Sequence, residues 1–127
     1  MAIILDTNAL SALADGDEKL LRAIEDEAEL ALPVIVLGEY LYGIQQSRLR
    51  ASYESWIKVN LPFFDLLPIA RETAECYSEI RRELKVAGTP IPTNDLWIAA
   101  LARHYGMRLV TRDGHFRAIQ GLRVQDW

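Results

Sequence analysis

The sequence predicts an α/β fold: a three-layer α/β/α sandwich with a short, mainly parallel central sheet. Short aliphatic runs alternate with longer stretches of helical periodicity, and this alternation is typical of parallel strands joined by helices. The first run, residues 2–5, is apolar without interruption, as expected of a strand that is covered on both faces. A length of 127 residues suits one core, so we expect residues 1–127 to form a single domain.

The first half of the chain predicts two strands and four helices. Gly16 separates the first two helices, Pro33 ends the second strand and suits the first turn of the next helix, and Pro62 stops the last helix. In chain order, we expect a strand at 2–5, helices at about 7–14 and 17–27, a strand at 28–32, and helices at 34–45 and 48–60.

The second half predicts two helices and three further strands. The longer helix is amphipathic, because Tyr77, Ile80 and Leu84 recur at helical spacing. Gly88 and Gly106 follow the ends of the two helices. In chain order, we expect a strand at 63–67, a helix at 71–86, a helix from a cap at Thr93 or Asn94 to Tyr105, and strands at 108–111 and 122–125.

Four acidic residues stand in or beside apolar segments, where lone charges are costly. Asp6 and Asp113 each come at or just past the end of a predicted strand. Glu39 interrupts an apolar helix, and Asp95 lies in the first turn of another helix, where the helix dipole favours a carboxylate. Because ligands bind outside the carboxyl ends of parallel strands, we expect these four side chains to meet at that edge of the sheet.

Four carboxylates at one edge imply a cation. Two carboxylates about 5 Å apart repel each other by roughly 3 kcal/mol at an effective dielectric constant of about 20, so such a cluster would bind protons or a divalent ion. Oxygen ligands, in a chain whose single cysteine is Cys76, favour Mg²⁺ or Mn²⁺ over Zn²⁺. Ions held in this way chiefly handle phosphates. The sequence therefore predicts an Mg²⁺ or Mn²⁺ site built from Asp6, Glu39, Asp95 and Asp113.

Charge is distributed unevenly along the chain. The net charge of −4 argues against electrostatic attraction of the whole molecule to nucleic acid. Seven of the 18 acidic residues lie within residues 15–29, however, and the rest of the chain has a slight excess of bases. No apolar run approaches the roughly 20 residues of a membrane span, and one cysteine excludes an internal disulfide. We therefore expect a cytoplasmic protein.

Four segments of the chain together match the pattern of a known family. They are IILDTNAL, LPVIVLGEYLYG, TPIPTNDLWIAALARHYG and LVTRDGHF. With these segments the chain resembles PIN-domain ribonucleases, and most closely the VapC-like toxins of type II toxin–antitoxin systems. The resemblance runs from Ala2 to about Val124, with the four acidic residues in the family's order.

The resemblance implies a metal-dependent endoribonuclease that cleaves single-stranded or loop regions of structured RNA. By position, the four acidic residues match the family's catalytic and metal-binding acids, and Asn8 and Thr111 match its polar supporting residues. Many relatives carry a further acid two positions after the last one, where this chain has His115. His115 is then a supporting ligand, a phosphate contact or a solvated loop residue, and the site holds one metal ion or two.

The resemblance also implies partners. These are an RNA substrate such as a tRNA or rRNA loop, a second copy in a homodimer, and a small cognate antitoxin. The C-terminal segment of the antitoxin would cover the acidic cleft, where an arginine or lysine would neutralise the carboxylates that hold the metal.

Two other protein classes with a similar sheet do not match this sequence. Haloacid-dehalogenase-type phosphatases and response-regulator receiver domains both need a late lysine, and no lysine follows Lys85. Two alternatives stay open: a PIN-like domain without activity that binds RNA or a partner, and a structure-specific DNA nuclease. Hydrolysis by a metal-activated water does not need the 2′-hydroxyl group, so the motif does not separate RNA from DNA.

Overall fold

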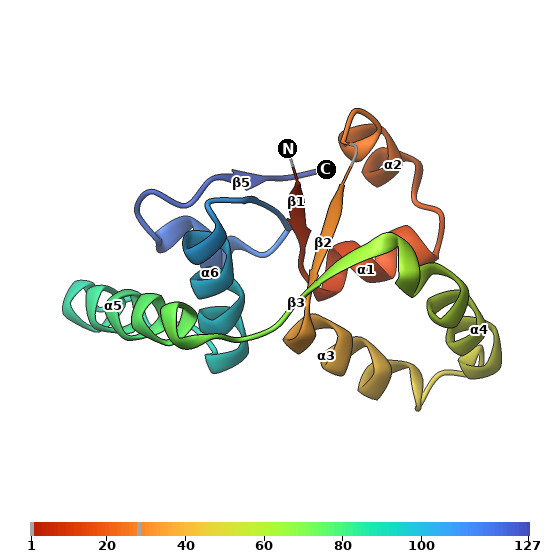
Figure 1. Cartoon of the computed structure of the whole chain (residues 1–127), viewed down its shortest axis with the longest axis horizontal. Coiled ribbons are helices and arrows are strands. Elements are labelled where there is room, and N and C mark those ends of the chain that lie inside the picture. The colour runs from red at the N-terminus through yellow and green to blue at the C-terminus, as the bar shows by residue number, and fades with distance from the viewer. Residues whose placement is uncertain (1, 28) are drawn as a thin grey trace.

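The central sheet has five strands in the order β3-β2-β1-β4-β5, and every pairing of neighbours is parallel. The computed structural model describes residues 2–27 and 29–127, and it confirms the predicted α/β fold. The strands are β1 (Ile3–Leu5), β2 (Leu30–Pro33), β3 (Phe64–Leu67), β4 (Arg108–Val110) and β5 (Val124–Gln125). The first strand of the chain is therefore the middle strand of the sheet (Figure 1).

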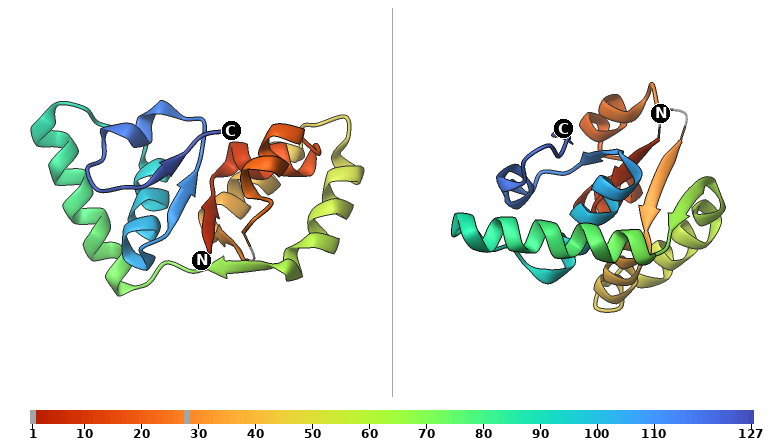
Figure 2. Two further views of the ribbon diagram at one scale, coloured as in Figure 1. Left: turned by 90° about the horizontal axis from the view of Figure 1, so that it is seen from above. Right: turned by 60° about the vertical axis from the view of Figure 1, so that its left-hand side comes forward.

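Helices connect the strands and cover both faces of the sheet. Figure 1 shows α5 and α6 on one side of β1 and β2, and α1 and α2 on the other side. The left view in Figure 2 shows the long helix α5 beside α6, away from the N-terminal helices. The helices are α1 (Thr7–Ala14), α2 (Glu18–Ile24), α3 (Val34–Ile44), α4 (Arg50–Asn60), α5 (Arg71–Ala87) and α6 (Thr93–Tyr105), with 3-10 turns η1 (Leu61–Phe63) and η2 (Gly114–Ala118).

The middle strand belongs to two cores, because successive residues of a strand point to opposite faces. Ile4 packs in the larger core with buried residues of α3, α5 and α6. Ile3 and Leu5 pack in the smaller core with buried residues of α1 and α2. All three side chains are at most 1% exposed, which explains why this strand is an unbroken aliphatic run.

Two predicted boundaries were wrong because local capping decides them. The second helix begins one residue later than expected, since Asp17 stands outside it and accepts hydrogen bonds from the backbone of Lys19 and Leu20 at 2.9 and 3.1 Å. Pro33 is the last residue of β2 and the N-cap of α3, rather than part of its first turn. Ala28, where the second strand was expected to begin, lies outside the described residues.

The cap of α6 also differs from the prediction. The N-cap is Pro92, in an extended conformation, rather than Thr93 or Asn94, and its side chain makes no capping hydrogen bond. Thr93 is therefore the first helical residue and Asp95 the third, where its carboxylate still faces the positive end of the helix dipole. The helix ends at Gly106, whose φ of 64° is readily adopted by glycine and turns the chain into β4.

Within residues 2–27 and 29–127, no helix is both long and apolar enough to cross a lipid bilayer.

Candidate metal centre

The sheet topology brings the predicted acidic residues to one edge. Asp6 directly follows β1, and its backbone N–H donates to the carbonyl of Val110 at the end of the neighbouring strand β4. Asp113 lies just beyond that strand, at the N-cap of η2. Glu39 and Asp95 come from α3 and from the first turn of α6. The carboxylates of Glu39, Asp95 and Asp113 are half-buried, so the cluster forms one partly sheltered acidic site.

Asp6 is the most buried of the four, with 4% of its surface exposed. One carboxylate oxygen accepts the backbone N–H of Ala9 at 2.8 Å, which caps α1, and the other accepts the hydroxyl of Thr111. Burial raises the pKa of Asp6 to about 6, because the charged form loses its water; these hydrogen bonds oppose the shift, and the charges of Asp95 and Asp113 add to it. The carboxylate therefore lacks a compensating positive charge.

Asp95, Asp113 and His115 form the tightest group in the site. The Nδ1 atom of His115 lies 3.0 Å from Oδ2 of Asp95 and 3.0 Å from Oδ1 of Asp113. Each of the three residues offers one ligand atom, and these atoms all lie within 4.8 Å of one another. Burial raises the pKa of Asp95, and the hydrogen bond to Asp95 raises the pKa of His115. The imidazole of His115 thus stands between two carboxylates, where a metal ion could stand.

Glu39 is held by a residue to which the sequence analysis gave no role. The hydroxyl of Thr7 donates to Oε1 of Glu39 at 2.8 Å, which joins the first turn of α1 to α3. The charge of Glu39 contributes to the raised pKa of Asp95, so the two carboxylates lie within electrostatic range. The position of Thr7, directly after a strand-end aspartate, was the only signal in the sequence that could have identified it.

The two predicted supporting residues have different surroundings. Thr111 is 1% exposed, and its hydroxyl donates to Asp6 while accepting the backbone N–H of Asp113 at 2.9 Å. It therefore fixes the two strand-end acids relative to each other. Asn8 lies in the first turn of α1 and is exposed.

The donor set fits a hard divalent cation. Carboxylate oxygens with one imidazole are ligands for Mg²⁺ or Mn²⁺, and imidazole is the softer member of the set. Burial is the main cause of the raised pKa values of Asp6 and Asp95, and the charges of the neighbouring carboxylates add to both shifts. A bound cation would relieve this repulsion.

The pKa of Asp6 predicts that metal-free protein loses stability as the pH rises from about 4 to about 6. Folded Asp6 keeps its proton to a higher pH than the unfolded chain, whose pKa is near 3.8, so deprotonation favours unfolding across this interval. The loss from this residue should be about 3 kcal/mol in the free energy of unfolding. His115 affects stability at a higher pH. Because the pKa of His115 is raised in the folded protein, its stabilising contribution is fully present below pH 6.5 and is lost as the pH rises through the pKa of the folded state.

Urea unfolding in EDTA at a series of pH values would measure this effect. Asp6→Asn should reduce the fall in the free energy of unfolding between about pH 4 and pH 6, because the asparagine side chain has no proton to release there. A free energy of unfolding that changes through this interval by the same amount in both proteins would contradict the assignment of the shift to Asp6.

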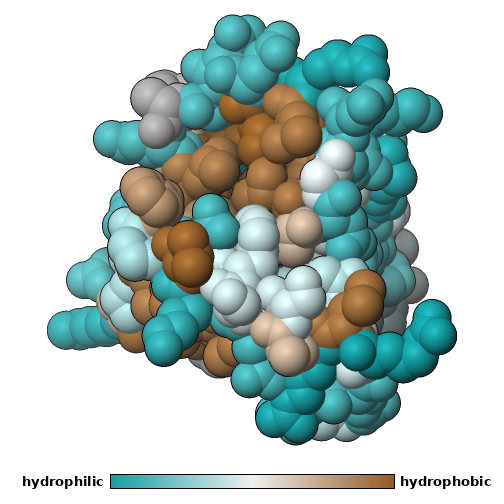
Figure 3. Space-filling view, turned by 90° about the vertical axis from the view of Figure 1, so that its right-hand side faces the viewer, coloured by the Kyte–Doolittle hydropathy of each residue, from teal (hydrophilic) through white to brown (hydrophobic). Residues whose placement is uncertain are grey.

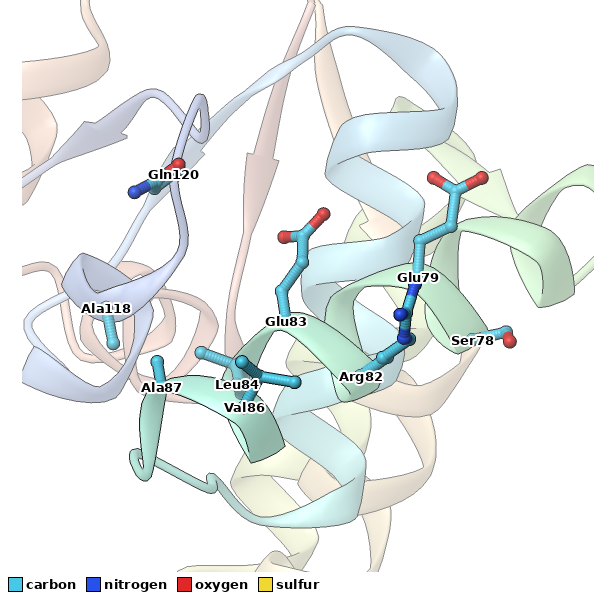
Figure 4. A pocket seen from close by; sticks show the side chains of 9 residues that line it. All are labelled: Ser78, Glu79, Arg82, Glu83, Leu84, Val86, Ala87, Ala118 and Gln120. Atoms are coloured by element: carbon cyan, nitrogen blue, oxygen red, sulfur yellow. The ribbon is translucent and has the colours of Figure 1, made fainter.

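A larger cavity lies elsewhere on the molecule. It has a volume of about 690 Å³ and lies between α5 and the segment around Gln120 (Figure 4). Its acidic side chains, Glu79 and Glu83, do not converge on a common point: the Glu83 carboxylate is bound by Arg103 at 3.1 and 3.2 Å. Size alone therefore does not identify a reactive site, and the group of perturbed carboxylates is the candidate site.

Known proteins share both the sequence pattern and the fold of this chain. The PIN domain family matches residues 3–122. Ribonuclease VapC1 of Rickettsia felis is 30% identical, over 98% of this chain and 95% of that protein. The tRNA(fMet)-specific endonuclease VapC of Salmonella typhimurium is 25% identical, over 100% of this chain and 98% of its own length.

Solved structures agree with these relatives. The DNA-bound VapBC complex from Salmonella typhimurium contains a chain that matches with a TM-score of 0.89 at 25% identity, covering 100% of this chain and 98% of that one. VapBC2 from Rickettsia felis, bound to a DNA fragment from its promoter, matches with a TM-score of 0.87 at 27% identity, covering 100% and 99%. The similarity in both cases extends over the whole sheet and its helices.

Proposed function

The chain belongs to the PIN domain family, and from that premise we propose that it is a metal-dependent endoribonuclease, with residues 1–127 as one nuclease domain. The observation that carries the proposal is the meeting of Asp6, Glu39, Asp95 and Asp113 at the carboxyl edge of the sheet, with raised pKa values at two of them. Relatives named as ribonucleases and as a tRNA(fMet)-specific endonuclease support RNA as the substrate.

The four carboxylates would hold Mg²⁺ or Mn²⁺, and His115 would stand beside them. When bound, such an ion lowers the pKa of a water molecule and polarises a phosphoryl oxygen. Thr111 keeps Asp6 and Asp113 in place, and Thr7 keeps Glu39 in place, so these hydroxyls orient the acids. Water attacks the phosphorus in line with the leaving 3′-oxygen, which yields a 5′-phosphate and a 3′-hydroxyl end.

Cleavage of total cellular RNA by the purified protein tests the proposal. With Mg²⁺ or Mn²⁺ we expect a small set of discrete fragments, and with EDTA none. Sequencing the fragment ends would identify the RNA, with tRNA and rRNA loops as the candidates, and would show 5′-phosphates. Ends with 2′,3′-cyclic phosphates would contradict the hydrolytic mechanism, and no cleavage in any metal would favour a silent RNA- or partner-binding domain.

An antitoxin protein is the second part of the proposal. Relatives of this chain were solved as VapBC complexes and as a toxin–antitoxin complex, so a protein partner is expected here too. Figure 3 shows apolar side chains gathered in a hollow in the upper half of the face that carries α2 and α4. Exposed apolar residues occur on the elements around it, including Leu21 on α2 and Val59 on α4. Such a surface suits the apolar face of a partner segment.

Two further assignments belong to the same proposal. We expect a homodimer, which sedimentation of the purified protein would test. We also expect the protein to act in the cytoplasm, where its RNA substrates are.

His115 is expected to make the site prefer Mn²⁺ over Mg²⁺. Its Nδ1 atom lies 3.0 Å from both Asp95 and Asp113, and imidazole binds Mn²⁺ more readily than Mg²⁺. His115→Ala should therefore weaken Mn²⁺ binding more than Mg²⁺ binding. The ratio of the Mn²⁺ affinity to the Mg²⁺ affinity, measured by calorimetry at pH 8, should fall. His104→Ala is the matched control, because the ring of His104 is hydrogen-bonded to Thr73 at 2.8 Å rather than to the acids. An unchanged ratio in His115→Ala would show that His115 is no ligand.

A further inference from the structure

A second cavity shares a wall with the candidate metal centre. It has a volume of about 300 Å³ and lies between α1, α3 and α4. Thr7 and Glu39, which are hydrogen-bonded to each other, line it on the side of the acids. Ser11 and Ser47 add hydroxyl groups along the opposite walls. A molecule bound at the acids could thus extend into this cavity.

Tyr40 lines this cavity and has an unsatisfied hydroxyl. Only 3% of Tyr40 is exposed, and its hydroxyl makes no hydrogen bond to any residue that the structure describes. A buried polar group without a partner is costly, so its presence beside a cavity needs an explanation. A tyrosine hydroxyl is protonated at neutral pH, so it can donate a hydrogen bond.

Tyr53 and Asp15 close the outer side of the cavity. The Tyr53 hydroxyl donates to Oδ1 of Asp15 at 2.7 Å, which joins α4 to the end of α1. Oδ2 of Asp15 accepts no hydrogen bond from the described part of the chain, so it is available to a ligand. The cavity therefore combines a free carboxylate oxygen, several hydroxyls and two tyrosine rings.

This chemistry excludes a phosphate and favours a nucleobase. Two carboxylates line the cavity and no lysine or arginine does, so a phosphate would be repelled. Carboxylate and hydroxyl oxygens accept N–H donors, and the Watson–Crick edge of guanine presents two adjacent donors to a carboxylate, whereas uracil presents one. Aromatic walls stack on bases that are extruded from single-stranded RNA. A base attached to a phosphate at the acids reaches the cavity without a separate association step.

We propose that this cavity receives the nucleobase next to the scissile phosphate and selects guanine through Asp15. The proposal rests on the proposed ribonuclease function, which supplies the phosphate at the acids. Asp15 then accepts the N–H donors of the base, Tyr53 orients Asp15, and the hydroxyl of Tyr40 gains a partner. The protein then prefers RNA with guanine next to the cleavage site, a preference that the carboxylates of the metal centre cannot provide.

Asp15→Asn tests the proposal, since it replaces the free acceptor by an amide donor while its oxygen can still accept from Tyr53. Two readouts are taken: the base next to each cut in total cellular RNA, and the affinity for labelled pentanucleotides with a central guanine or uracil, in Ca²⁺ to slow cleavage. We expect the guanine preference of the unmodified chain to fall about tenfold, the loss expected of one well-placed base contact. Tyr53→Phe keeps the carboxylate but removes the hydrogen bond that orients it, so the guanine preference should fall by a smaller factor than in Asp15→Asn.

Glu79→Gln is the matched control, because it removes one acidic charge in the separate cavity on α5. Thermal unfolding and Mg²⁺ affinity show that each variant is folded with its acids intact. If the unmodified chain cuts RNA and Asp15→Asn keeps the same base preference in both readouts, the proposal is overturned while the ribonuclease function stands. If no metal gives cleavage but pentanucleotide selection still depends on Asp15, the cavity assignment stands and the ribonuclease function fails.

A protein occupant would give a different result. Methylguanidinium imitates the end of an arginine side chain and can be titrated into the same variants. If Asp15→Asn weakens its binding and leaves the base preference unchanged, the cavity belongs to a protein partner and the proposal is overturned.

Discussion

Asp6→Asn is expected to lower the rate of RNA cleavage by roughly 10²–10³-fold or more, without loss of the fold. Asp6 is the most buried of the four acids, and both of its oxygens are held, one by the backbone of Ala9 and one by Thr111. An amide in its place removes one negative charge from the proposed metal ligands and offers a donor where an acceptor was. Both metal affinity and the rate at saturating metal should therefore fall.

The same change should raise the stability of the metal-free protein at pH 7. The pKa of Asp6 is raised to about 6 chiefly by burial, so the charged side chain destabilises the fold at neutral pH. We expect a gain of about 1–2 kcal/mol in the free energy of unfolding, because the amide avoids the charge but keeps fewer hydrogen bonds. Urea unfolding in EDTA measures the gain, and a gel assay with Mn²⁺ measures the rate.

Asp65→Asn is the control for this experiment. Asp65 lies on the edge strand β3 and is exposed, so neither rate nor stability should change. A loss of more than about 2 kcal/mol in Asp6→Asn would instead show that Asp6 is structural, as a helix cap whose charge the fold requires.

Phe116→Ala is expected to lower the free energy of unfolding by about 3–5 kcal/mol. Phe116 is 1% exposed and packs in the larger core, although it belongs to the short turn η2. The same turn begins after Asp113 and contains His115, so the buried ring anchors the segment that carries these two side chains. We therefore expect weaker Mn²⁺ binding as well, at temperatures where the variant is still folded.

Phe63→Ala provides the matched comparison. Phe63 is 80% exposed in the other 3-10 turn, so its removal should change stability by less than about 0.5 kcal/mol and leave metal binding unchanged. Chemical denaturation and calorimetry with Mn²⁺ measure both variants. If Phe116→Ala loses stability but binds Mn²⁺ as before, the turn is held by its own backbone rather than by the ring.

Local patterns in the sequence were enough to predict the fold class and most of the elements. The aliphatic run at 2–5 predicted a strand buried on both faces, and β1 is the middle of the sheet. Proline and glycine marked the ends of elements because their backbone preferences act within a few residues. Errors occurred where a single cap decides a boundary, as at Pro92, whose extended backbone begins α6 without a side-chain hydrogen bond.

The sequence by itself also determined which acidic residues lie at strand ends and first helical turns, since those positions depend on neighbours in the chain. Their roles as metal ligands stay a prediction. Only the tertiary structure decided which side chains contact each other. The hydrogen-bonded pairs are Thr7 with Glu39, 32 positions apart, His115 with Asp95, 20 positions apart, and Thr111 with Asp6, 105 positions apart. Side-chain periodicity carries no information about such pairs, because strand order and helix packing set them through contacts between segments far apart in the chain.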